Sequence, residues 1–310
     1  MRTLVLTCLL WFSIARAQNT QVPEYYVSDE RLSKALLEIV TDLNLNKDFF
    51  TGEDGWEQIS LAVIDLTREP AHFGGVQADN FIYPASVYKM YVAAEILNQV
   101  SDGELTLETA HVVRAPNDVD QSKGILWDPR PLMRDGDTVT VNYLLDLMIT
   151  RSDNSAANCL IDIAQRENIN ALMHRYHWEG SEVTRKFLSR KYEDPGYEKI
   201  HGTETSALHA ADFLYRIETD QLVNPWVSQQ LKTLLGRQLD SMKMTQGLPA
   251  NAMFYHKTGW FSYWTHDVGI VDDGKVRYVV ACFLPLEEDL ALMKHKELAR
   301  RIYQLMTALR

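Results

Sequence analysis

Apolar residues change their spacing along the chain, and each spacing predicts a different element. Between 28 and 43 they recur every three or four positions, which predicts a helix capped by Ser28. The segment 59–66 is almost continuously apolar, as in a strand that is buried on both faces. A short strand is expected at 80–83, and helical spacing begins again after Pro84.

The middle of the chain is predicted to be helical, and its last third is predicted to contain strands. Residues 101–138 are rich in Asp, Gly, Pro and Asn, which is typical of loops. Beyond them the patterns predict helices at 140–150, 153–167, 206–217 and 225–238, strands at 252–258, 266–271 and 276–284, a hairpin turn at Asp272-Asp273-Gly274, and a last helix from about Glu287 to Leu309.

This order of elements predicts an α+β fold. Strands lie near both ends of the chain and helices lie between them, so the simplest packing joins both ends in one antiparallel sheet flanked by helices. We expect a sheet lobe at about 28–83 and 245–310 and an all-helical lobe at about 84–244. The active site is then expected in the cleft between the two lobes.

Residues 1–17 are interpreted as a signal peptide. Residues 3–14 are mostly apolar, and Ala15-Arg16-Ala17 is a small-x-small cleavage site. Cleavage would leave 18–310 as a catalytic domain in the periplasm or outside the cell, and the alternatives are an uncleaved anchor or a buried apolar segment. Cys8 lies inside the apolar run rather than after it, which argues against a lipoprotein anchor. No later stretch is long enough for a transmembrane helix.

Composition and charge exclude several classes of function. The chain has 310 residues, of which 46% are hydrophobic and 24% are charged, as in ordinary globular proteins. Its formal net charge of −11 argues against nucleic acid and against an anionic membrane surface as partners. One disulfide could join Cys159 and Cys282. A secreted chain of this size can build its core without it, so we expect two separate buried thiols.

One pair of residues suggests nucleophilic catalysis. Ser86 and Lys89 lie three positions apart at the start of a predicted helix, so their side chains share one face. A serine hydroxyl becomes a good nucleophile when a neighbouring base removes its proton. A lysine can be that base when burial or nearby cations depress its pKa. On its own the spacing is weak evidence, because it also describes a capped helix with a solvated lysine.

Two further motifs make the pattern specific. Ser152-Asp153-Asn154 lies between two predicted helices, and Lys257-Thr258-Gly259 ends an apolar strand. With the Ser-x-x-Lys pair they resemble the signature set of the serine β-lactamases and penicillin-binding proteins. Class A β-lactamases are the most similar in size and in the stretch 149–158, and residues 202–207 resemble the family's threonine-rich helix start. The resemblance runs from about residue 30 to the end of the chain.

The resemblance implies a catalytic role for each motif. Ser86 is the nucleophile that the β-lactam carbonyl acylates, and Lys89 activates it directly or through water. Ser152 relays a proton toward the leaving nitrogen, and Asn154 holds the side-chain amide of the substrate. The backbone N–H groups of Ser86 and Trp260 form the oxyanion hole.

The family also implies how the substrate is held. Lys257 and Thr258, with Gly259 in the same motif, bind the substrate carboxylate. No metal or other cofactor is needed, and the nine histidines contain no His-x-His cluster. His174 and His177 are interpreted as a helix-surface pair. We expect a monomer that acts on a small-molecule β-lactam.

The chain departs from the class A pattern at the glutamate that activates the deacylating water. It has no aromatic-Glu-Pro-x-Leu-Asn run, and the nearest match is Tyr192-Glu193, downstream of Thr184-Arg185. Glu193 is therefore the candidate base, the alternative being an exposed acid in a charged loop. Glu198 and Glu179 are weaker candidates.

Two other departures concern the substrate pocket. His266 stands nine residues after Lys257, where many class A enzymes have an arginine that helps to hold the carboxylate. A neutral histidine is a weaker partner for a carboxylate. Trp260 and Trp264 either narrow the pocket and favour an apolar substrate edge, or serve core and rim packing.

Three functions remain open from the sequence. The first is a serine β-lactamase that acylates and deacylates. The second is a peptidase or esterase of the same fold that acts on cell-wall peptides or other acyl substrates. The third is a penicillin-recognising module that stays acylated, or a non-catalytic relative.

Overall fold

A six-stranded sheet forms the centre of the molecule. The computed structural model describes residues 22–52, 55–120, 128–187 and 202–310. The sheet order is β1 (Val27–Ser28), β5 (His72–Val76), β4 (Ser60–Asp65), β12 (Arg277–Leu284), β11 (Trp264–Asp272) and β10 (Met253–Phe261). Neighbours are antiparallel except for β1 and β5, which are parallel. Both ends of the chain share this sheet, and the predicted fold class is confirmed.

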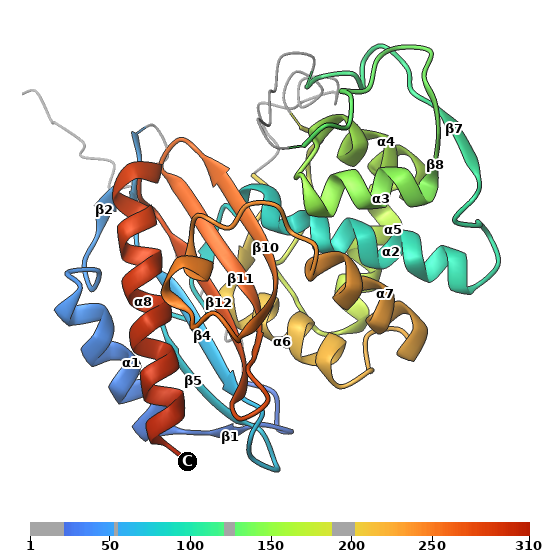
Figure 1. Cartoon of the computed structure of the whole chain (residues 1–310). Helices are drawn as coiled ribbons and strands as arrows, with labels where there is room; N and C mark the ends of the chain where they lie inside the picture. The colour runs from blue at the N-terminus through green and yellow to red at the C-terminus, as the bar shows by residue number, and fades with distance from the viewer. Residues whose placement is uncertain (1–21, 53–54, 121–127, 188–201) are drawn as a thin grey trace, which may run out of the picture.

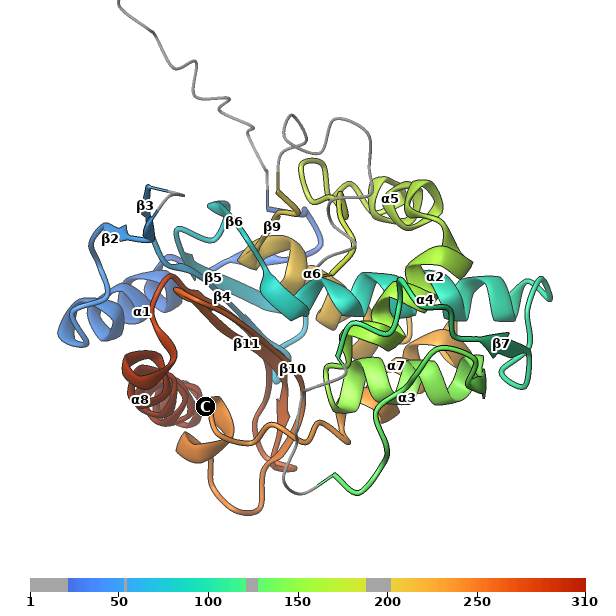
Figure 2. The same cartoon turned by 90° about the horizontal axis from the view of Figure 1, so that it is seen from above.

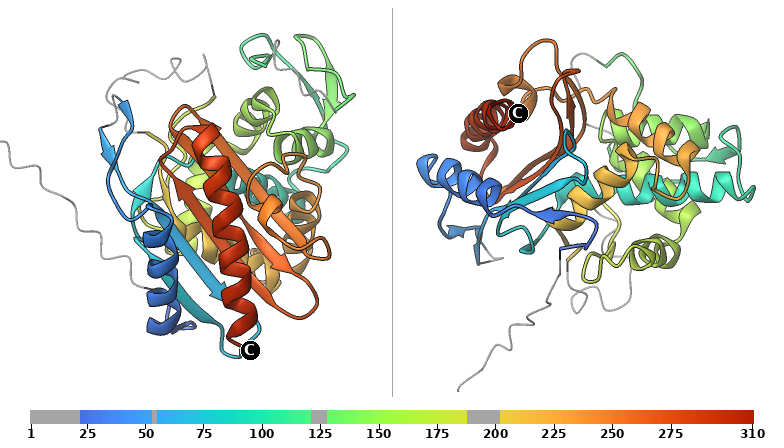
Figure 3. Two further views of the ribbon diagram at one scale, coloured as in Figure 1. Left: turned by 60° about the vertical axis from the view of Figure 1, so that its left-hand side comes forward. Right: turned by 90° about the horizontal axis from the view of Figure 1, so that it is seen from below.

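Helices cover both faces of the sheet (Figure 1, Figure 2). On one face α1 (Glu30–Asp42) and α8 (Glu288–Ala308) lie side by side along the strands (Figure 3). The other side holds the remaining helices: α2 (Lys89–Ser101), α3 (Val141–Thr150), α4 (Asn154–Ala164), α5 (Arg166–Arg175), α6 (Ala207–Glu218) and α7 (Pro225–Leu235).

The central strands are apolar at nearly every position because both of their faces are buried. In β4, Ala62 and Ile64 belong to the core shared with the helical side, whereas Leu61 and Val63 belong to the core under α1 and α8. β12 alternates between the same two cores. Successive side chains of a strand point to opposite faces, so a strand between two layers needs apolar residues on both.

α2 is the helix that the other helices surround. Every residue from Lys89 to Gln99 is buried, and a helix that is buried all round lies inside a core. It directly follows the 3-10 turn η2 (Ala85–Tyr88). The segment before η2 contains β6 (Phe81–Ile82). β6 pairs with β9 (Thr205–Ser206), which lies just before α6, and this pairing fixes where η2 begins. The start of α2 is thereby tied to both the sheet side and the helical side.

Some boundaries differ from the predictions. α1 is capped by Asp29, whose carboxylate accepts from two backbone N–H groups, and Ser28 belongs to β1. The helix predicted at 153–167 ends at Ala164, and α5 follows as a separate helix. The chain turns at Gln165, whose φ of 66° is left-handed. This conformation usually marks a glycine, and a non-glycine residue seldom adopts it. Because the turn is made by a glutamine, nothing in the local sequence indicates that the helix ends here.

Short strand pairs were missed by the pattern of hydrophobic residues. Within 101–138, which was expected to be mostly loop, β7 (Ala110–Val112) pairs with β8 (Thr138–Thr140). A second pair is β2 (Phe49–Phe50) with β3 (Trp56–Glu57).

The strand β5 was also missed, because it contains two glycines, which are depleted in strands. A Cβ on Gly74 would lie 2.5 Å from Cγ of Leu32, so this glycine lets α1 pack closely on the sheet.

Both cysteines within the described residues are buried thiols that form no disulfide, as predicted. Cys159 lies in α4 and Cys282 in β12. Burial raises the pKa of the Cys282 thiol above its usual range, so it behaves as a small apolar group. None of the helices within the described ranges is long and apolar enough to cross a membrane.

Asp212 of α6 joins the N-terminal segment to the helices. Its buried carboxylate accepts from Tyr25 Oη at 2.5 Å, Tyr26 Oη at 2.6 Å and Trp178 Nε1 at 2.8 Å. It also pairs with Arg216 Nε at 2.9 Å. Burial and the neighbouring carboxylate raise the pKa of Tyr26 well above its usual value, so its hydroxyl remains a donor. Four donors on one buried carboxylate make this cluster a stabilising anchor.

We expect Asp212→Ala to destabilise the protein by about 3–5 kcal/mol, because it removes the carboxylate that accepts from the partly buried Arg216 and from three further donors. Urea unfolding followed by tryptophan fluorescence measures the change. Asp42→Ala is the control: Asp42 also pairs with an arginine, Arg301, but its side chain is 67% exposed, so its loss is expected to cost under about 1 kcal/mol. Equal losses in both variants would show that the cluster is not an anchor.

Candidate active site

Ser86 lies at the turn that leads into α2. It is the second residue of η2, and its carbonyl accepts from the N–H of Lys89. Ala85 before it has a left-handed φ of 47°. A non-glycine residue in this region is strained, and such strain clusters at functional sites. Ser86 is half-buried, whereas its neighbours from 84 to 90 are buried, so it is the accessible residue of the turn.

The ammonium of Lys89 is fully buried and lies among acceptors. Nζ donates to Ser152 O at 2.7 Å and to Asn154 Oδ1 at 2.8 Å, and Ser152 Oγ lies at 3.3 Å. A buried charge is tolerated when it is hydrogen-bonded in this way. The Ser-x-x-Lys pair and the Ser-Asp-Asn motif are thus in direct contact.

The Ser-Asp-Asn motif forms the tight turn between α3 and α4. Ser152 has a left-handed φ of 58°, which lets both its carbonyl and its hydroxyl reach Lys89. Asp153 caps α4 by accepting from the N–H of Ala156, and it pairs with the buried Arg151 at 2.8 Å. The middle residue of the motif therefore holds the turn, and the outer two face the lysine.

The Lys-Thr-Gly motif lies on β10, the edge strand of the sheet. A Cβ on Gly259 would lie 2.8 Å from Pro84 O and 3.2 Å from Ser86 N, so only glycine allows β10 to approach η2 this closely. Lys257 and Thr258 are both buried, and Lys257 Nζ donates to Thr258 O at 2.8 Å. The fold thus brings residues of all three motifs together around Ser86 and Lys89.

Phe187 is a neighbour of Lys89 that the sequence analysis did not single out. The centre of its ring lies 4.2 Å from Lys89 Nζ, and the ring stacks on Tyr88 at 4.8 Å. Asn158 fixes its backbone from both sides: Oδ1 accepts from Phe187 N at 2.8 Å, and Nδ2 donates to Phe187 O at 3.3 Å. One signal for this residue was present in the sequence. Phe187 follows Arg185 by two positions, in the segment that leads toward Tyr192-Glu193.

His266 is built into the core and does not offer a nitrogen to a substrate. Its side chain is fully buried, and its Nδ1 accepts from the N–H of Leu284 at 3.2 Å. Nε2 must then carry the proton, which it donates to Tyr83 O at 2.9 Å. Burial lowers the pKa of His266 to about 3, so the ring is neutral at ordinary pH. Through these two hydrogen bonds His266, on β11, binds β12 at Leu284 and the segment before η2 at Tyr83.

The aromatic residues near β10 divide into core and rim. Trp264 is 4% exposed and packs in the core, edge-on to Tyr83. Trp260 and Phe261 are 54% and 52% exposed. Of the two tryptophans considered above, Trp260 alone stands at an accessible position beside the Lys-Thr-Gly motif.

The candidate deacylating residues are placed only in part. Glu193 and Glu198 lie outside the described residues. Glu179 lies in the turn after α5, where its Oε1 is 3.6 Å from His177 Nδ1 and both side chains are exposed. The sequence reasoning about the deacylating base therefore stays a prediction.

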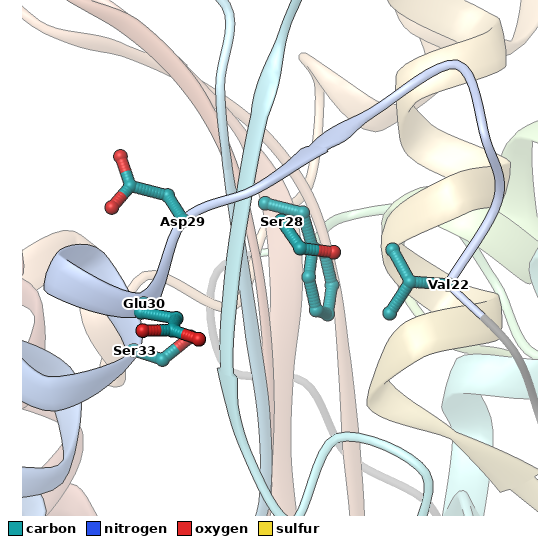
Figure 4. A pocket seen from close by; sticks show the side chains of 6 residues that line it. Val22, Ser28, Asp29, Glu30 and Ser33 are labelled. Atoms are coloured by element: carbon teal, nitrogen blue, oxygen red, sulfur yellow. The ribbon is translucent and has the colours of Figure 1, made fainter.

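A cavity of about 380 Å³ lies at the opposite edge of the sheet, where β1, β5 and the start of α1 meet (Figure 4). Polar residues from the start of α1 and the aromatic ring of β5 contribute to its lining, which comprises Val22, Ser28, Asp29, Glu30, Ser33 and Phe73. It shares no residue with the three motifs. Within the part of the chain that the structure describes, no group of three His, Cys, Asp or Glu side chains is arranged to hold a metal ion.

The sequence model of the Beta-lactamase enzyme family matches residues 44–306, which is most of the chain. No curated protein matches the sequence.

The fold is similar to several solved structures. A beta-lactamase from Sphaerobacter thermophilus DSM 20745 has a TM-score of 0.73 and 17% identity over 89% of this chain and 98% of its own. A variant of PBP-A, solved as an acyl-enzyme complex with penicillin G, has a TM-score of 0.73 and 19% identity over 89% and 97%. The ancestral class A β-lactamase GNCA has a TM-score of 0.72 and 22% identity over 88% and 99%. At such identities the shared feature is the fold.

The neutral, buried state of His266 predicts a pH dependence of stability. Its pKa is about 3 in the folded protein and about 6.5 in an unfolded chain. Below about pH 6.5 the unfolded chain binds a proton that the folded chain does not, so stability falls as the pH falls. Each such histidine contributes a slope of about 1.4 kcal/mol per pH unit between about pH 6 and 4.

We therefore expect His266→Gln to reduce this slope by about 1.4 kcal/mol per pH unit, because glutamine keeps a donor and an acceptor but does not titrate. Urea unfolding at a series of pH values measures the slope, which is informative even if the variant is less stable throughout. His177→Gln, at a side chain that is 88% exposed, is the control and should leave the slope unchanged. An unaltered slope in His266→Gln would contradict the buried neutral assignment.

Proposed function

The chain belongs to the beta-lactamase enzyme family, and we propose that it is a serine hydrolase that opens the β-lactam amide through an acyl-enzyme on Ser86. Family membership supports β-lactam hydrolysis in general. The observation that carries the finer proposal is the meeting of the three motifs: Lys89 binds Ser152 and Asn154, and Gly259 lies against the backbone of Ser86.

The proposed reaction uses these contacts in order. In the reacting form Lys89 is a neutral amine, which takes the proton of the Ser86 hydroxyl, directly or through water, while the oxygen attacks the β-lactam carbonyl carbon. The backbone N–H groups of Ser86 and Trp260 stabilise the oxyanion. Ser152 passes a proton to the leaving nitrogen as the C–N bond breaks, and it recovers a proton from Lys89, whose Nζ lies 3.3 Å from its Oγ, so that the ester and a neutral amine at Lys89 remain.

The proposed substrate contacts follow from the same arrangement. Asn154 donates to the side-chain amide of the substrate, and Lys257 and Thr258 bind its carboxylate. Because β10 is an edge strand, its outer backbone groups can pair with an extended substrate edge. Trp260 gives this edge an exposed apolar rim. His266, buried and neutral, is not among the proposed contacts.

We also propose that residues 1–17 direct export to the periplasm or the exterior, leaving 18–310 as a monomeric catalytic domain. In this proposal the sheet lobe comprises about 28–83 and 245–310, and the helical lobe about 84–244.

Ser86→Ala is expected to abolish covalent labelling by penicillin G, because the variant has no nucleophile for the carbonyl. Intact-mass spectrometry measures the label, and a chromogenic cephalosporin measures turnover. Ser101→Ala, an exposed serine at the other end of α2, should label and turn over like the unchanged protein. Persistent labelling of folded Ser86→Ala would refute the mechanism.

A second candidate function is a penicillin-recognising protein that acylates and turns over slowly. The observation that favours it is Phe187, whose ring lies over the ammonium of Lys89. An aromatic ring holds a cation by its negative face, but it can neither accept a proton from water nor orient it by a hydrogen bond. Where the ring of Phe187 covers Lys89, a water molecule therefore has no base in the ring to activate it, and deacylation is expected to be slow.

Phe187→Glu is expected to shorten the lifetime of the penicillin acyl-enzyme by about 100- to 10,000-fold, the usual contribution of a general base. Phe187→Gln opens the same space without a base and is the matched control. Mass spectrometry after removal of free penicillin measures the lifetime. The β-lactamase function instead requires that the unchanged protein deacylates rapidly and that Glu193→Gln, with Glu193 as the base, lengthens the lifetime by a similar factor.

A further inference from the structure

Asp120 is a buried carboxylate that contacts the Ser-Asp-Asn motif from outside it. Its side chain accepts twice from one residue: Oδ2 from Asn154 N at 2.5 Å and Oδ1 from Asn154 Nδ2 at 2.9 Å. Its own N–H donates to Ser155 Oγ at 3.1 Å. Asp120 is 5% exposed, so these bonds are shielded from competing water.

The two partners of the Asn154 amide have opposite hydrogen-bonding character. The ammonium of Lys89 can only donate, so the atom that faces it must be the carbonyl oxygen Oδ1. The carboxylate of Asp120 can only accept, so the atom that faces it must be Nδ2. A flip of the amide would place two donors against each other on one side and two acceptors on the other. Asp120 and Lys89 together therefore allow one orientation of Asn154.

We propose that Asp120 is a positioning residue for acylation and for recognition of the substrate side chain. It holds Asn154 with Oδ1 toward Lys89, and it leaves the second hydrogen of Nδ2 to donate to an amide carbonyl of the substrate. This proposal rests on the proposed function of Ser86 and Lys89.

The order of the groups strengthens the bonds. Lys89, the Asn154 amide and Asp120 form a chain with a positive end and a negative end, and an amide between opposite charges is polarised so that each bond reinforces the other. The N–H of Asn154 is also the first of α4, so the carboxylate faces the positive end of that helix. A role confined to stabilising α4 would affect unfolding but would not distinguish between substrates.

The test compares two penicillins that differ in the amide. Penicillin G carries a side-chain amide, and 6-aminopenicillanic acid does not. In Asp120→Asn the new amide cannot accept from both donors of Asn154, so the orientation of Asn154 is released. We expect the acylation rate constant for both compounds to fall, by up to about 100-fold, as Lys89 loses its fixed acceptor. The preference for penicillin G over 6-aminopenicillanic acid should fall by a further 3- to 10-fold or so.

Three further variants isolate the contact. Asp135→Asn removes an equal charge at an exposed position between β7 and β8, and it should change neither rate nor preference. Asp120→Glu keeps the carboxylate and should retain more of the preference than Asp120→Asn. In the Asn154→Ala background, Asp120→Asn should change the preference no further.

The outcomes separate the proposal from its premise. Loss of the preference in Asp120→Asn but not in Asp135→Asn supports the positioning role. An unchanged preference in Asp120→Asn, with a lower unfolding midpoint alone, would overturn it and leave Asp120 as a stabiliser of α4. If the unchanged protein is not labelled at Ser86 by either compound, the proposed function itself fails and this inference fails with it.

Discussion

A buried ammonium group must find hydrogen-bond acceptors in the protein, and Lys89 meets this requirement at the start of α2. Its acceptors come from the turn between α3 and α4, where Ser152 adopts a strained left-handed conformation. The aromatic ring of Phe187 lies over the same group. Elements from three parts of the chain are thus held by one cation, and a change at any of them alters the surroundings of the candidate nucleophile.

The sheet and α2 make this arrangement rigid. α2 is buried on all sides, so the residue at its start has little freedom to move relative to the core. β10 reaches the same point from the sheet, and Gly259 lets the two backbones approach within contact distance. A side chain at this position would separate the Lys-Thr-Gly motif from Ser86. The positions of the three motifs therefore follow from packing that is formed before any substrate binds.

Much of this could be predicted from the sequence, because the strongest patterns come from burial on two faces. The continuous apolar runs of β4 and β12 and the signature motifs identified the sheet and the candidate site. The rest depended on tertiary contacts that leave no local pattern. Gln165 turns the chain in a conformation that usually requires glycine, and the glycines of β5 serve the close packing of α1. His266 was assigned from its spacing to Lys257, but spacing along a strand does not reveal that both ring nitrogens bind the backbone. Phe187 and Asp120 lie near the motifs only in three dimensions.

The pairing of β4 with β12 joins segments from opposite ends of the chain. During synthesis β4 is made before the helices α2–α7, and its neighbour β12 is made only after them. Closing so long a loop is slow, and proteins dominated by such contacts fold late and slowly. The helices can collapse locally, but the Lys-Thr-Gly strand has no sheet to join until β11 and β12 exist. The nascent chain is therefore expected to remain without its candidate active site until β10, β11 and β12 have all been made.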